Sequence, residues 1–291
     1  TADSLPAAQQ AELDGIIAQT PYPEGLIWRA EKGDTVLHLV GTMHLYDPRL
    51  DPILARIQPL IPASDLILLE TTKAAEAQLQ SDIANHAELL FITEGPTLPD
   101  LLPEPVWQTL ADQARARQIP AFMAAKFQPW YLSLMLAVPP CAMEAMISGQ
   151  RGLDHMIMDQ AETAGVPTQA LEPYDMLFQL FGDEPMAKQI DMLQATISMN
   201  RDADVLFATL LETYFAESHV KAWRSSRRAT YEMPGVSRAE IDAMFTEMEE
   251  VLLIRRNRNW LPVISEATRQ HDTLMIAIGA AHLGGKDGVL N

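Results

Sequence analysis

The chain has 291 residues, of which 21 are Lys or Arg and 39 are Asp or Glu, so its formal net charge is −18. This negative charge repels phosphate backbones and anionic lipid, which argues against nucleic acid or a membrane surface as partners. The single cysteine, Cys141, excludes an intramolecular disulfide framework and a thiolate-rich zinc site. Hydrophobic residues make up 48% of the sequence, enough to bury a substantial core.

In chain order, the sequence first predicts a short polar helix, Ala7–Ala18, within an N-terminal helical extension over residues 1–25. Two strand-like runs follow between Leu26 and Val40. The segment Glu31–Asp34 between them contains a Gly that suits a tight hairpin turn. A further run, Asp65–Glu70, is predicted to be a buried strand that ends in a carboxylate.

From residue 76 to about residue 270 the pattern is mostly helical, with one possible short strand at Pro167–Glu172. Residues 273–278 form another apolar run, typical of a buried strand. We therefore predict a single α/β domain over residues 26–291, with a central mixed sheet built from N- and C-terminal strands and a large helical insertion, about 76–270, forming a cap. The apolar stretch Trp130–Ile147 is too short and too interrupted by prolines to span a bilayer.

Two segments, Gly41–His44 and Gly279–His282, place the same Gly-x-x-His pattern directly after an apolar strand. Glycine lets the chain turn sharply out of a sheet, so each His is carried beyond the carboxyl edge, where ligands bind in open α/β sheets. Glu70 also directly follows an apolar strand, so we expect the three side chains to converge. Such a group ligates a divalent transition metal, or acts without one through a His base oriented by a carboxylate. The structural alternative is that these histidines only pack at strand ends.

Further segments extend the pattern along the chain. In order, the segments are Gly41–His44, the strand that ends at Glu70, Gly152–Asp154, Leu171–Glu172, Arg256–Trp260 and Gly279–Leu283. Through them the chain resembles the TraB/GumN family from about Leu26 to Leu290. Relatives of that family include the Tiki metalloproteases and, more distantly, erythromycin esterases and the ChaN haem- and iron-binding proteins.

The resemblance implies an α/β fold with His44, Glu70 and His282 as the functional core, which the Tiki branch uses for metal-dependent cleavage of peptide bonds. In that version the three residues hold a divalent ion such as Mn, Co or Zn, which lowers the pKa of a bound water and polarises a carbonyl. Asp154 and Glu172 are then candidates for the proton-handling carboxylate or for a partner of a metal ligand.

Other candidates come from the same segments. Arg256 is a candidate to bind a substrate carboxylate or to stabilise an oxyanion, and Asn257 is a candidate second donor. Asp154 equally suits a helix N-cap. The basic run Lys221–Arg228 is expected to be a solvated helix face paired with acidic neighbours. Four further histidines lack ligand spacing and are expected to have surface roles: His86, His155, His219 and His271.

The leading hypothesis is a metal-dependent hydrolase that cleaves a peptide or a small acyl substrate. One alternative is a metal-independent esterase-type hydrolase with a His base. Another is a protein that binds haem, iron or a peptide signal without turnover. Thr1–Leu5 contains no initiator Met and no charged-then-apolar leader. Together with the resemblance, this favours an extracytoplasmic, periplasmic bacterial location.

Overall fold

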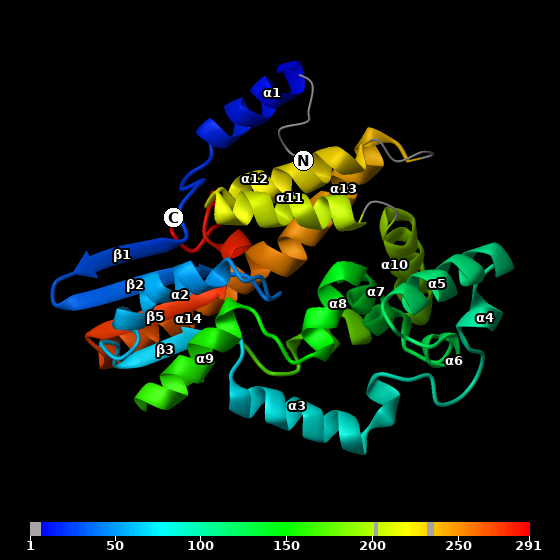
Figure 1. The fold of residues 1–291 in the computed structure, drawn as a ribbon, viewed down its shortest axis with the longest axis horizontal. Helices are drawn as coiled ribbons and strands as arrows, with labels where there is room; N and C mark the ends of the chain where they lie inside the picture. The colour runs from blue at the N-terminus through cyan, green and yellow to red at the C-terminus, as the bar shows by residue number, and fades with distance from the viewer. Residues whose placement is uncertain (1–6, 201–202, 232–235) are drawn as a thin grey trace. The chain divides into compact units, whose positions relative to one another are not determined.

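A computed structural model describes residues 7–200, 203–231 and 236–291, which form two compact units (Figure 1). The first unit lies within residues 1–73, 149–172 and 206–291, and the second within residues 74–148 and 173–205. Helix α1, Ala7–Ala18, forms at the predicted residues, whereas the first six residues of the expected extension lie outside the described part.

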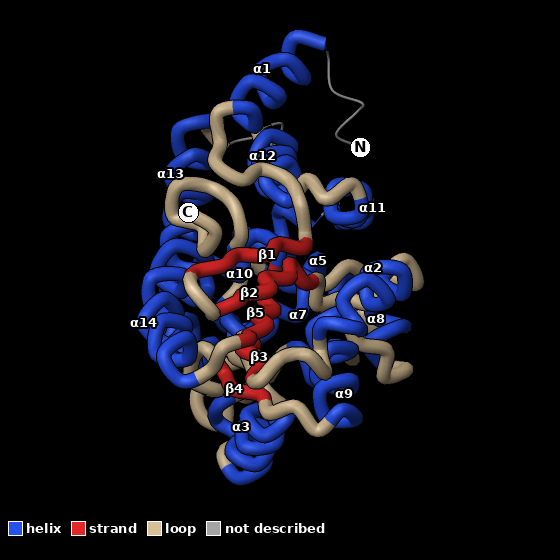
Figure 2. The backbone as a smooth tube through the Cα atoms, turned by 90° about the vertical axis from the view of Figure 1, so that its left-hand side faces the viewer, coloured by secondary structure: helices blue, strands red, loops and turns tan. Residues whose placement is uncertain are grey.

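The first unit is built on a five-stranded sheet with the order β1-β2-β5-β3-β4 (Figure 2). The strands are β1 Ile27–Lys32, β2 Thr35–Thr42, β3 Leu66–Leu69, β4 Thr168–Ala170 and β5 Thr273–Gly279. β1 pairs antiparallel with β2, and all other neighbours run parallel. This mixed sheet, with helices making up 61% of the structure, confirms the predicted α/β fold.

Short-range sequence signals place the strands. Gly33 has φ +61° in the turn between β1 and β2, the left-handed region that glycine enters without strain. The side chains of β3 are all buried, and β5 is buried over its five central residues. A strand that is apolar on both faces must be covered on both faces, as central strands of parallel sheets are.

Helices of the same unit cover the two faces of the sheet (Figure 2). α2, Leu50–Ile57, and α9, Leu153–Ala164, pack with one face, and α14, Arg255–Gln270, packs with the other. Alternate side chains of each strand enter opposite cores, because the side-chain period of a strand is two residues. In β5, for example, Met275 belongs to the core under α2 and α9, and Ile276 to the core under α14.

The four parallel strands end at one edge of the sheet, and polar side chains follow each of them. Thr42 at the end of β2 is level with Gly279 at the end of β5. His44 follows β2, Glu70 follows β3, and His282 lies in the 3-10 turn η7, Ala280–His282, directly after β5. The topology therefore brings the predicted residues to the same edge of the sheet.

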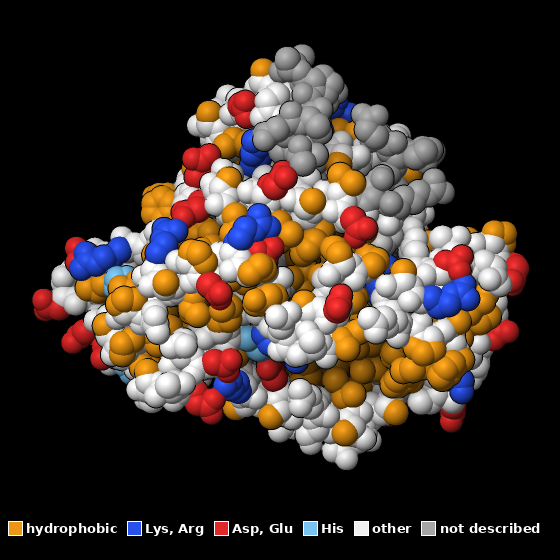
Figure 3. Space-filling model, viewed as in Figure 1, with side chains coloured by type: hydrophobic (Ala, Val, Ile, Leu, Met, Phe, Trp, Pro, Cys, Tyr) orange, Lys and Arg blue, Asp and Glu red, His pale blue; other side chains and the backbone are white. Residues whose placement is uncertain are grey.

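Three further helices of the first unit follow one another in the chain, and the middle one carries the basic run. They are α11 Ala203–Phe215, whose first residues belong to the second unit, α12 His219–Thr230 and α13 Arg238–Glu249. On α12, Arg224, Arg227 and Arg228 each pair with an acidic side chain. The basic run is thus a helix face with acidic neighbours, as predicted. On the face shown in Figure 3, Lys and Arg side chains lie singly or in small groups beside Asp and Glu.

The second unit is helical and has its own apolar core. Its helices are α3 Lys73–Asn85, α4 Leu98–Leu101, α5 Glu104–Ala116, α6 Ala121–Ala124, α7 Pro129–Ala137, α8 Pro140–Ile147 and α10 Met186–Met199. Two short helical turns, η3 Ala87–Leu89 and η4 Phe178–Gly182, also belong to it. The first residue of α3, Lys73, is still assigned to the first unit. No single described helix is long and apolar enough to cross a membrane. α7 and α8 together have the required length and apolar composition, but the chain bends by 98° between them.

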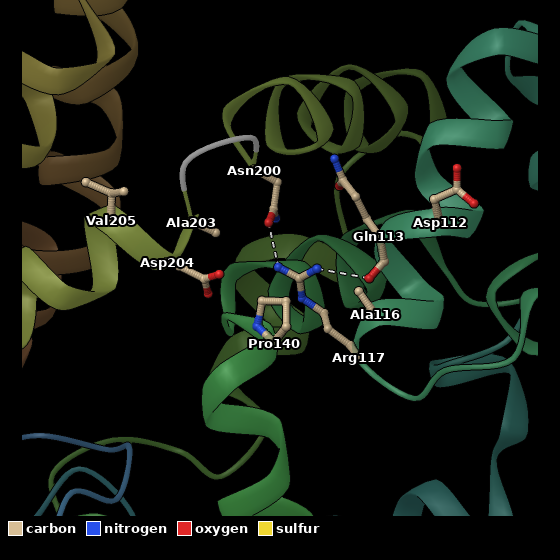
Figure 4. A pocket seen from close by; sticks show the side chains of 9 residues that line it. All are labelled: Asp112, Gln113, Ala116, Arg117, Pro140, Asn200, Ala203, Asp204 and Val205. Carbon is tan, nitrogen blue, oxygen red and sulfur yellow. Dashed lines mark hydrogen bonds between the residues drawn. The ribbon is translucent and has the colours of Figure 1, made fainter.

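A buried arginine ties this second unit together beside a cavity of about 430 Å³ (Figure 4). The Arg117 guanidinium donates to the carbonyl oxygens of Gln113, Leu136 and Val138 and to Asn200 Oδ1. Leu136 and Val138 lie at the C-terminal end of α7, where backbone carbonyls lack helical partners. A cation at this end also complements the helix dipole, so the structure explains Arg117 as a cap for α7.

Candidate active site

His44 is held at the end of β2 by the start of α9. Its Nδ1 lies 3.2 Å from Asp154 Oδ2, in the first turn of that helix. The Leu153 N–H donates to the Met43 carbonyl at 2.9 Å, which fixes the helix against the strand end. A Cβ on Gly152 would lie 2.1 Å from the same carbonyl oxygen, so only glycine permits this approach.

The protonation of this pair follows from its surroundings. Although desolvation opposes a charged imidazole, the hydrogen bond to Asp154 and the negative charges of Glu70 and Asp154 raise the pKa of His44 to about 9. Although burial opposes a charged carboxylate, the close imidazole nitrogens of His155 and His44, each 3.2 Å from Oδ2, hold the pKa of Asp154 well below its usual range. At neutral pH the pair is therefore an imidazolium beside a carboxylate, and the imidazole is still 59% exposed.

Glu70 lies between the strand ends and is held at both oxygens. Oε1 accepts the Gly279 N–H at 2.6 Å, and Oε2 accepts Arg256 Nη2 at 2.5 Å. Although burial disfavours its charge, the positive charges of His44 and Arg256 and the Gly279 N–H lower the pKa of Glu70 to about 2. Glu70 is thus ionised across the physiological range.

His282 is buried and has one defined tautomer. Its Nδ1 lies 2.6 Å from Asn257 Oδ1, while Asn257 Nδ2 donates to the Asp287 carbonyl at 2.8 Å. Because an amide oxygen only accepts, Nδ1 of His282 must donate, which leaves the lone pair on Nε2. Arg256 Nη1, which only donates, lies 3.3 Å from that Nε2. Burial and the charge of Arg256 lower the pKa of His282 to about 3, so the imidazole is neutral.

Arg256 joins these groups to Glu172, the residue that follows β4 and its neighbour Leu171. Nε and Nη2 of Arg256 donate to Glu172 at 2.9 and 2.6 Å. Nη1 also lies 3.3 Å from the Leu252 carbonyl. With the contacts to Glu70 and His282, all five N–H groups of Arg256 have acceptors inside the protein. In this arrangement Arg256 contacts three site residues, Glu70, Glu172 and His282, and it would have to release one of them to bind a substrate carboxylate.

A π-helical turn, η6 Glu250–Ile254, connects α13 to α14 and ends two residues before Arg256. Such turns insert an extra residue into the helical register and are frequent at functional sites. After this turn, Arg256, Asn257 and Trp260 lie on the helix face toward the strand ends, and Trp260 Nε1 donates to Glu172 Oε2 at 3.0 Å. Trp260 is fully buried, with its ring centroid 4.4 Å from that of His282.

Gly279 lies at the centre of the convergence. A Cβ built on it would lie 3.2 Å from Glu70 Oε1, 3.5 Å from His282 Cδ2 and 3.7 Å from His44 Nε2. The two histidines and the carboxylate, 26 to 238 residues apart in number, thus surround one small volume that the missing side chain leaves open. His282 Nε2 is 4.0 Å from Glu70 Oε1 across this volume.

We expect Gly279→Ala to lower kcat/KM about tenfold, an effect comparable to loss of a residue that orients an active-site group. The residue has φ −50°, so alanine causes no backbone strain there. Its methyl group would instead fill the volume between Glu70 and His44 Nε2. The helical Gly15, where an added methyl group would meet no neighbouring side chain within 4 Å, gives the matched control Gly15→Ala. Equal kcat/KM for both variants would contradict this view of the centre.

All seven residues predicted for the site lie around Gly279 or hold a residue that does. Hydrogen bonds join five of them in one network, Glu70, Glu172, Arg256, Asn257 and His282, and His44 and Asp154 form a separate pair beside it. The sequence reasoning missed His155, whose Nδ1 lies 3.2 Å from Asp154 Oδ2 and for which its position beside Asp154 was the only signal. The surface role predicted for His219 is wrong. That side chain is buried, and its Nε2 lies 3.1 Å from the Tyr22 carbonyl oxygen, because α12 packs its first turn against this loop.

The two imidazoles and the carboxylate of His44, His282 and Glu70 are the types of ligand that divalent transition metals bind. Among the described residues, no group of three or more His, Cys, Asp or Glu side chains is already spaced as a metal cage. However, both imidazoles are anchored at Nδ1, by Asp154 and Asn257, as metal-ligating histidines usually are. The distance of 4.0 Å between His282 Nε2 and Glu70 Oε1 exceeds the roughly 3.4 Å separation of two ligands around tetrahedral zinc by about half an ångström.

Comparison with known proteins identifies one relationship. The model of the TraB/PrgY/gumN family matches residues 26–291, which is nearly the whole chain. No curated protein and no solved structure matches the chain. The matched range contains every residue of the network described above.

Proposed function

Because the chain belongs to the TraB/PrgY/gumN family, we propose that it is a metal-dependent hydrolase of peptide or related acyl bonds, with His44, Glu70 and His282 as its centre. One observation carries the proposal: the two imidazoles are held at Nδ1 by separate partners, Asp154 and Asn257, around the open volume at Gly279. Such outer partners orient the ring. They leave Nε2 of His44 for a ligand or a proton, and a ligand at Nε2 of His282 would replace its contact with Arg256 Nη1 at 3.3 Å.

The electrostatics of the site also support a bound cation. Glu70, Asp154 and Glu172 contribute three carboxylates, against the one permanent positive charge of Arg256. The hydrogen bond to Asp154 and the negative charges of Glu70 and Asp154 raise the pKa of His44 to about 9, so these groups favour a positive charge at this position. A divalent cation that replaces the proton would experience the same field.

Each residue then has a defined part in the reaction. When bound by His44, Glu70 and His282, the metal would lower the pKa of a water molecule and polarise the scissile carbonyl. Asp154 holds the Nδ1 proton of His44, and Asn257 fixes the tautomer of His282. Arg256 keeps Glu70 ionised and in place, and Glu172 anchors Arg256.

A second candidate, a metal-independent hydrolase, is favoured by the position of Arg256. Its guanidinium already supplies a positive charge between Glu70 and His282, at 2.5 Å and 3.3 Å. His44 with Asp154 forms the pair of an acid–base group and an orienting carboxylate that such hydrolases use. In this version His44 moves the proton at Nε2, and Arg256 stabilises developing negative charge.

Metal removal and reconstitution test the proposal. The purified protein is expected to bind about one Mn²⁺, Co²⁺ or Zn²⁺ per chain and to cleave members of a peptide and ester library. A chelator should abolish cleavage, and the added metal should restore it. Binding should be tighter at pH 8 than at pH 6, because the metal displaces a proton from His44, whose pKa is about 9. Glu70→Gln should weaken binding, whereas Glu266→Gln on an exposed surface of α14 should not.

The other outcomes identify the alternatives. Cleavage that survives the chelator but is lost in His44→Gln would replace the proposal with the metal-independent hydrolase. Retention of haem, iron or a peptide without turnover would replace it with a binding protein. An extracytoplasmic location is part of the proposal, and fractionation of the source cells tests it.

A further inference from the structure

Arg151 directly precedes the segment that is packed against the backbone of His44. A Cβ on Gly152 would lie 2.1 Å from the Met43 carbonyl oxygen and 2.4 Å from the carbonyl carbon and oxygen of His44. The next residue, Leu153, donates its N–H to the same Met43 carbonyl at 2.9 Å. Arg151 is therefore one residue away from a direct backbone contact with His44, and both residues belong to the first unit.

The Arg151 side chain is exposed and has no acidic partner among the residues that the structure describes. The other described arginines, Arg255 excepted, contact an acidic side chain or, in Arg117, backbone and amide oxygens. Acidic residues outnumber basic ones by 39 to 21 in this chain, so most guanidinium groups find a carboxylate. Arg151 is an exception, and it lies next to the candidate active site.

Among the described residues of the centre itself, no cation is free for an anionic substrate. All five N–H groups of Arg256 already have acceptors inside the protein. The His44 imidazole is engaged with Asp154 at Nδ1. A substrate carboxylate at the centre would also be repelled by Glu70 and Asp154. Recognition of such a group therefore requires a cation outside the centre but next to it.

We infer that Arg151 recognises a free carboxylate of the substrate, so that the proposed hydrolase acts on peptides or acyl compounds that carry this group near the cleaved bond. Its effect on turnover rests on the proposed function, but binding of the carboxylate can be observed without turnover. A guanidinium presents two parallel N–H groups that match the two oxygens of a carboxylate. A singly charged carboxylate is also repelled less by the acidic centre than a doubly charged phosphate would be.

The position of Arg151 suits a group of the substrate that stays near solvent. The His44 imidazole is 59% exposed, so the centre is open to solvent on this side. A long arginine side chain carries its charge well beyond its own backbone, so that of Arg151 reaches solvent close to this imidazole. Arg151 would then bind the substrate equally in the ground state and the transition state. An interaction of that kind changes KM and leaves kcat unchanged.

Three short peptides test carboxylate recognition by the full chain. They are acetyl-trialanine with a free C-terminal carboxylate, its C-terminal amide, and an amide peptide whose central residue is glutamate. The wild type should bind the better of the two acidic peptides about fivefold more tightly than the uncharged amide, which is the upper range for a solvent-exposed ion pair. Comparison of the two acidic peptides shows whether a C-terminal or a side-chain carboxylate is preferred. Equal binding of all three peptides would overturn the inference.

Three variants show whether the preference depends on Arg151. Arg151→Gln removes the charge and should abolish the preference, whereas Arg151→Lys keeps the charge without the planar pair of donors and should retain part of it. The matched control is Arg255→Gln. Arg255 is also exposed and unpaired within the described part of the chain, but it lies on α14, on the opposite face of the sheet from α9. Equal losses in Arg151→Gln and Arg255→Gln would indicate a general charge effect and overturn the inference.

The readout that needs neither metal nor turnover is the ¹⁵Nε–H spectrum of the arginine side chains in the metal-free protein. The signal that is missing in Arg151→Gln identifies Arg151. This signal should move when the preferred acidic peptide is added, and it should stay in place with the uncharged amide. A signal that does not move with either acidic peptide would overturn the inference, whatever the activity assays show.

Kinetics separate this inference from the proposed function. Arg151→Gln should raise KM for the preferred acidic peptide about fivefold with kcat unchanged, and should change neither value for the uncharged amide. Cleavage of acidic and uncharged peptides with equal kcat/KM would sustain the proposed function and overturn the inference. A peptide-dependent shift of the Arg151 signal in a protein that neither binds metal nor cleaves any peptide would sustain the inference and refute the proposed function instead.

Discussion

The His282→Ala variant is expected to lose metal binding and to lower kcat/KM by more than about 100-fold, beyond the effect of removing an outer partner. Nε2 of His282 carries no proton at neutral pH, whereas the His44 imidazole is protonated. Of the two imidazoles, His282 can therefore bind a metal without first losing a proton. The substitution also leaves Asn257 Oδ1 buried without its donor, at a cost of about 1–3 kcal/mol in unfolding free energy. Metal titration, steady-state kinetics and chemical denaturation measure the three effects.

His219→Ala is the matched control for this prediction. His219 is as buried as His282 and lies outside the centre. Its Nε2 makes a hydrogen-bond contact at 3.1 Å to the Tyr22 carbonyl oxygen, whereas His282 has contacts at both ring nitrogens. We expect a similar loss of unfolding free energy with metal binding and turnover unchanged. If His282→Ala kept both functions, or if both variants lost them equally, the assignment of His282 as a ligand would fail.

Arg256→Met should destabilise the protein by about 3–5 kcal/mol, because it leaves buried charges without a partner. The side chains of Arg256, Glu70 and Glu172 are 13%, 13% and 9% exposed, so water cannot replace the guanidinium. Denaturant-induced unfolding at pH 7 measures the loss. Arg258→Met on the same helix is the control: its side chain is 62% exposed and pairs with Asp287 and Glu250, and such surface pairs contribute at most about 1 kcal/mol.

The pH dependence of this destabilisation has a defined sign. In the wild type the pKa of Glu70 is lowered from 4.5 to about 2, so its ion pair stabilises the fold fully above pH 4.5 and less as the pH falls toward 2. In Arg256→Met the Glu70 carboxylate loses the positive charge that lowers its pKa, so it can take up a proton at a higher pH. The difference in unfolding free energy between wild type and variant should therefore shrink from pH 6 to pH 3. A difference that stays constant over this range would show that packing, not charge, causes the destabilisation.

Much of the fold was readable from the sequence because local patterns decide it. The continuous apolar runs at β3 and β5 predicted buried strands, and glycine between two short runs predicted the β1–β2 turn. The repeated Gly-x-x-His segments and Glu70 also had to lie at one edge, since parallel strands present their carboxyl ends on the same side. The sequence thus determined which residue types meet and at which edge of the sheet.

Only the tertiary structure decided how those residues are arranged. The π-turn before Arg256 sets which face of α14 meets the strand ends, and helical periodicity does not reveal such a turn. The tautomer of His282 and the opposite pKa shifts of the two histidines depend on contacts between segments up to 238 residues apart. Hydrogen bonds and charge interactions depend on distances within a few ångströms, and long-range packing sets those distances.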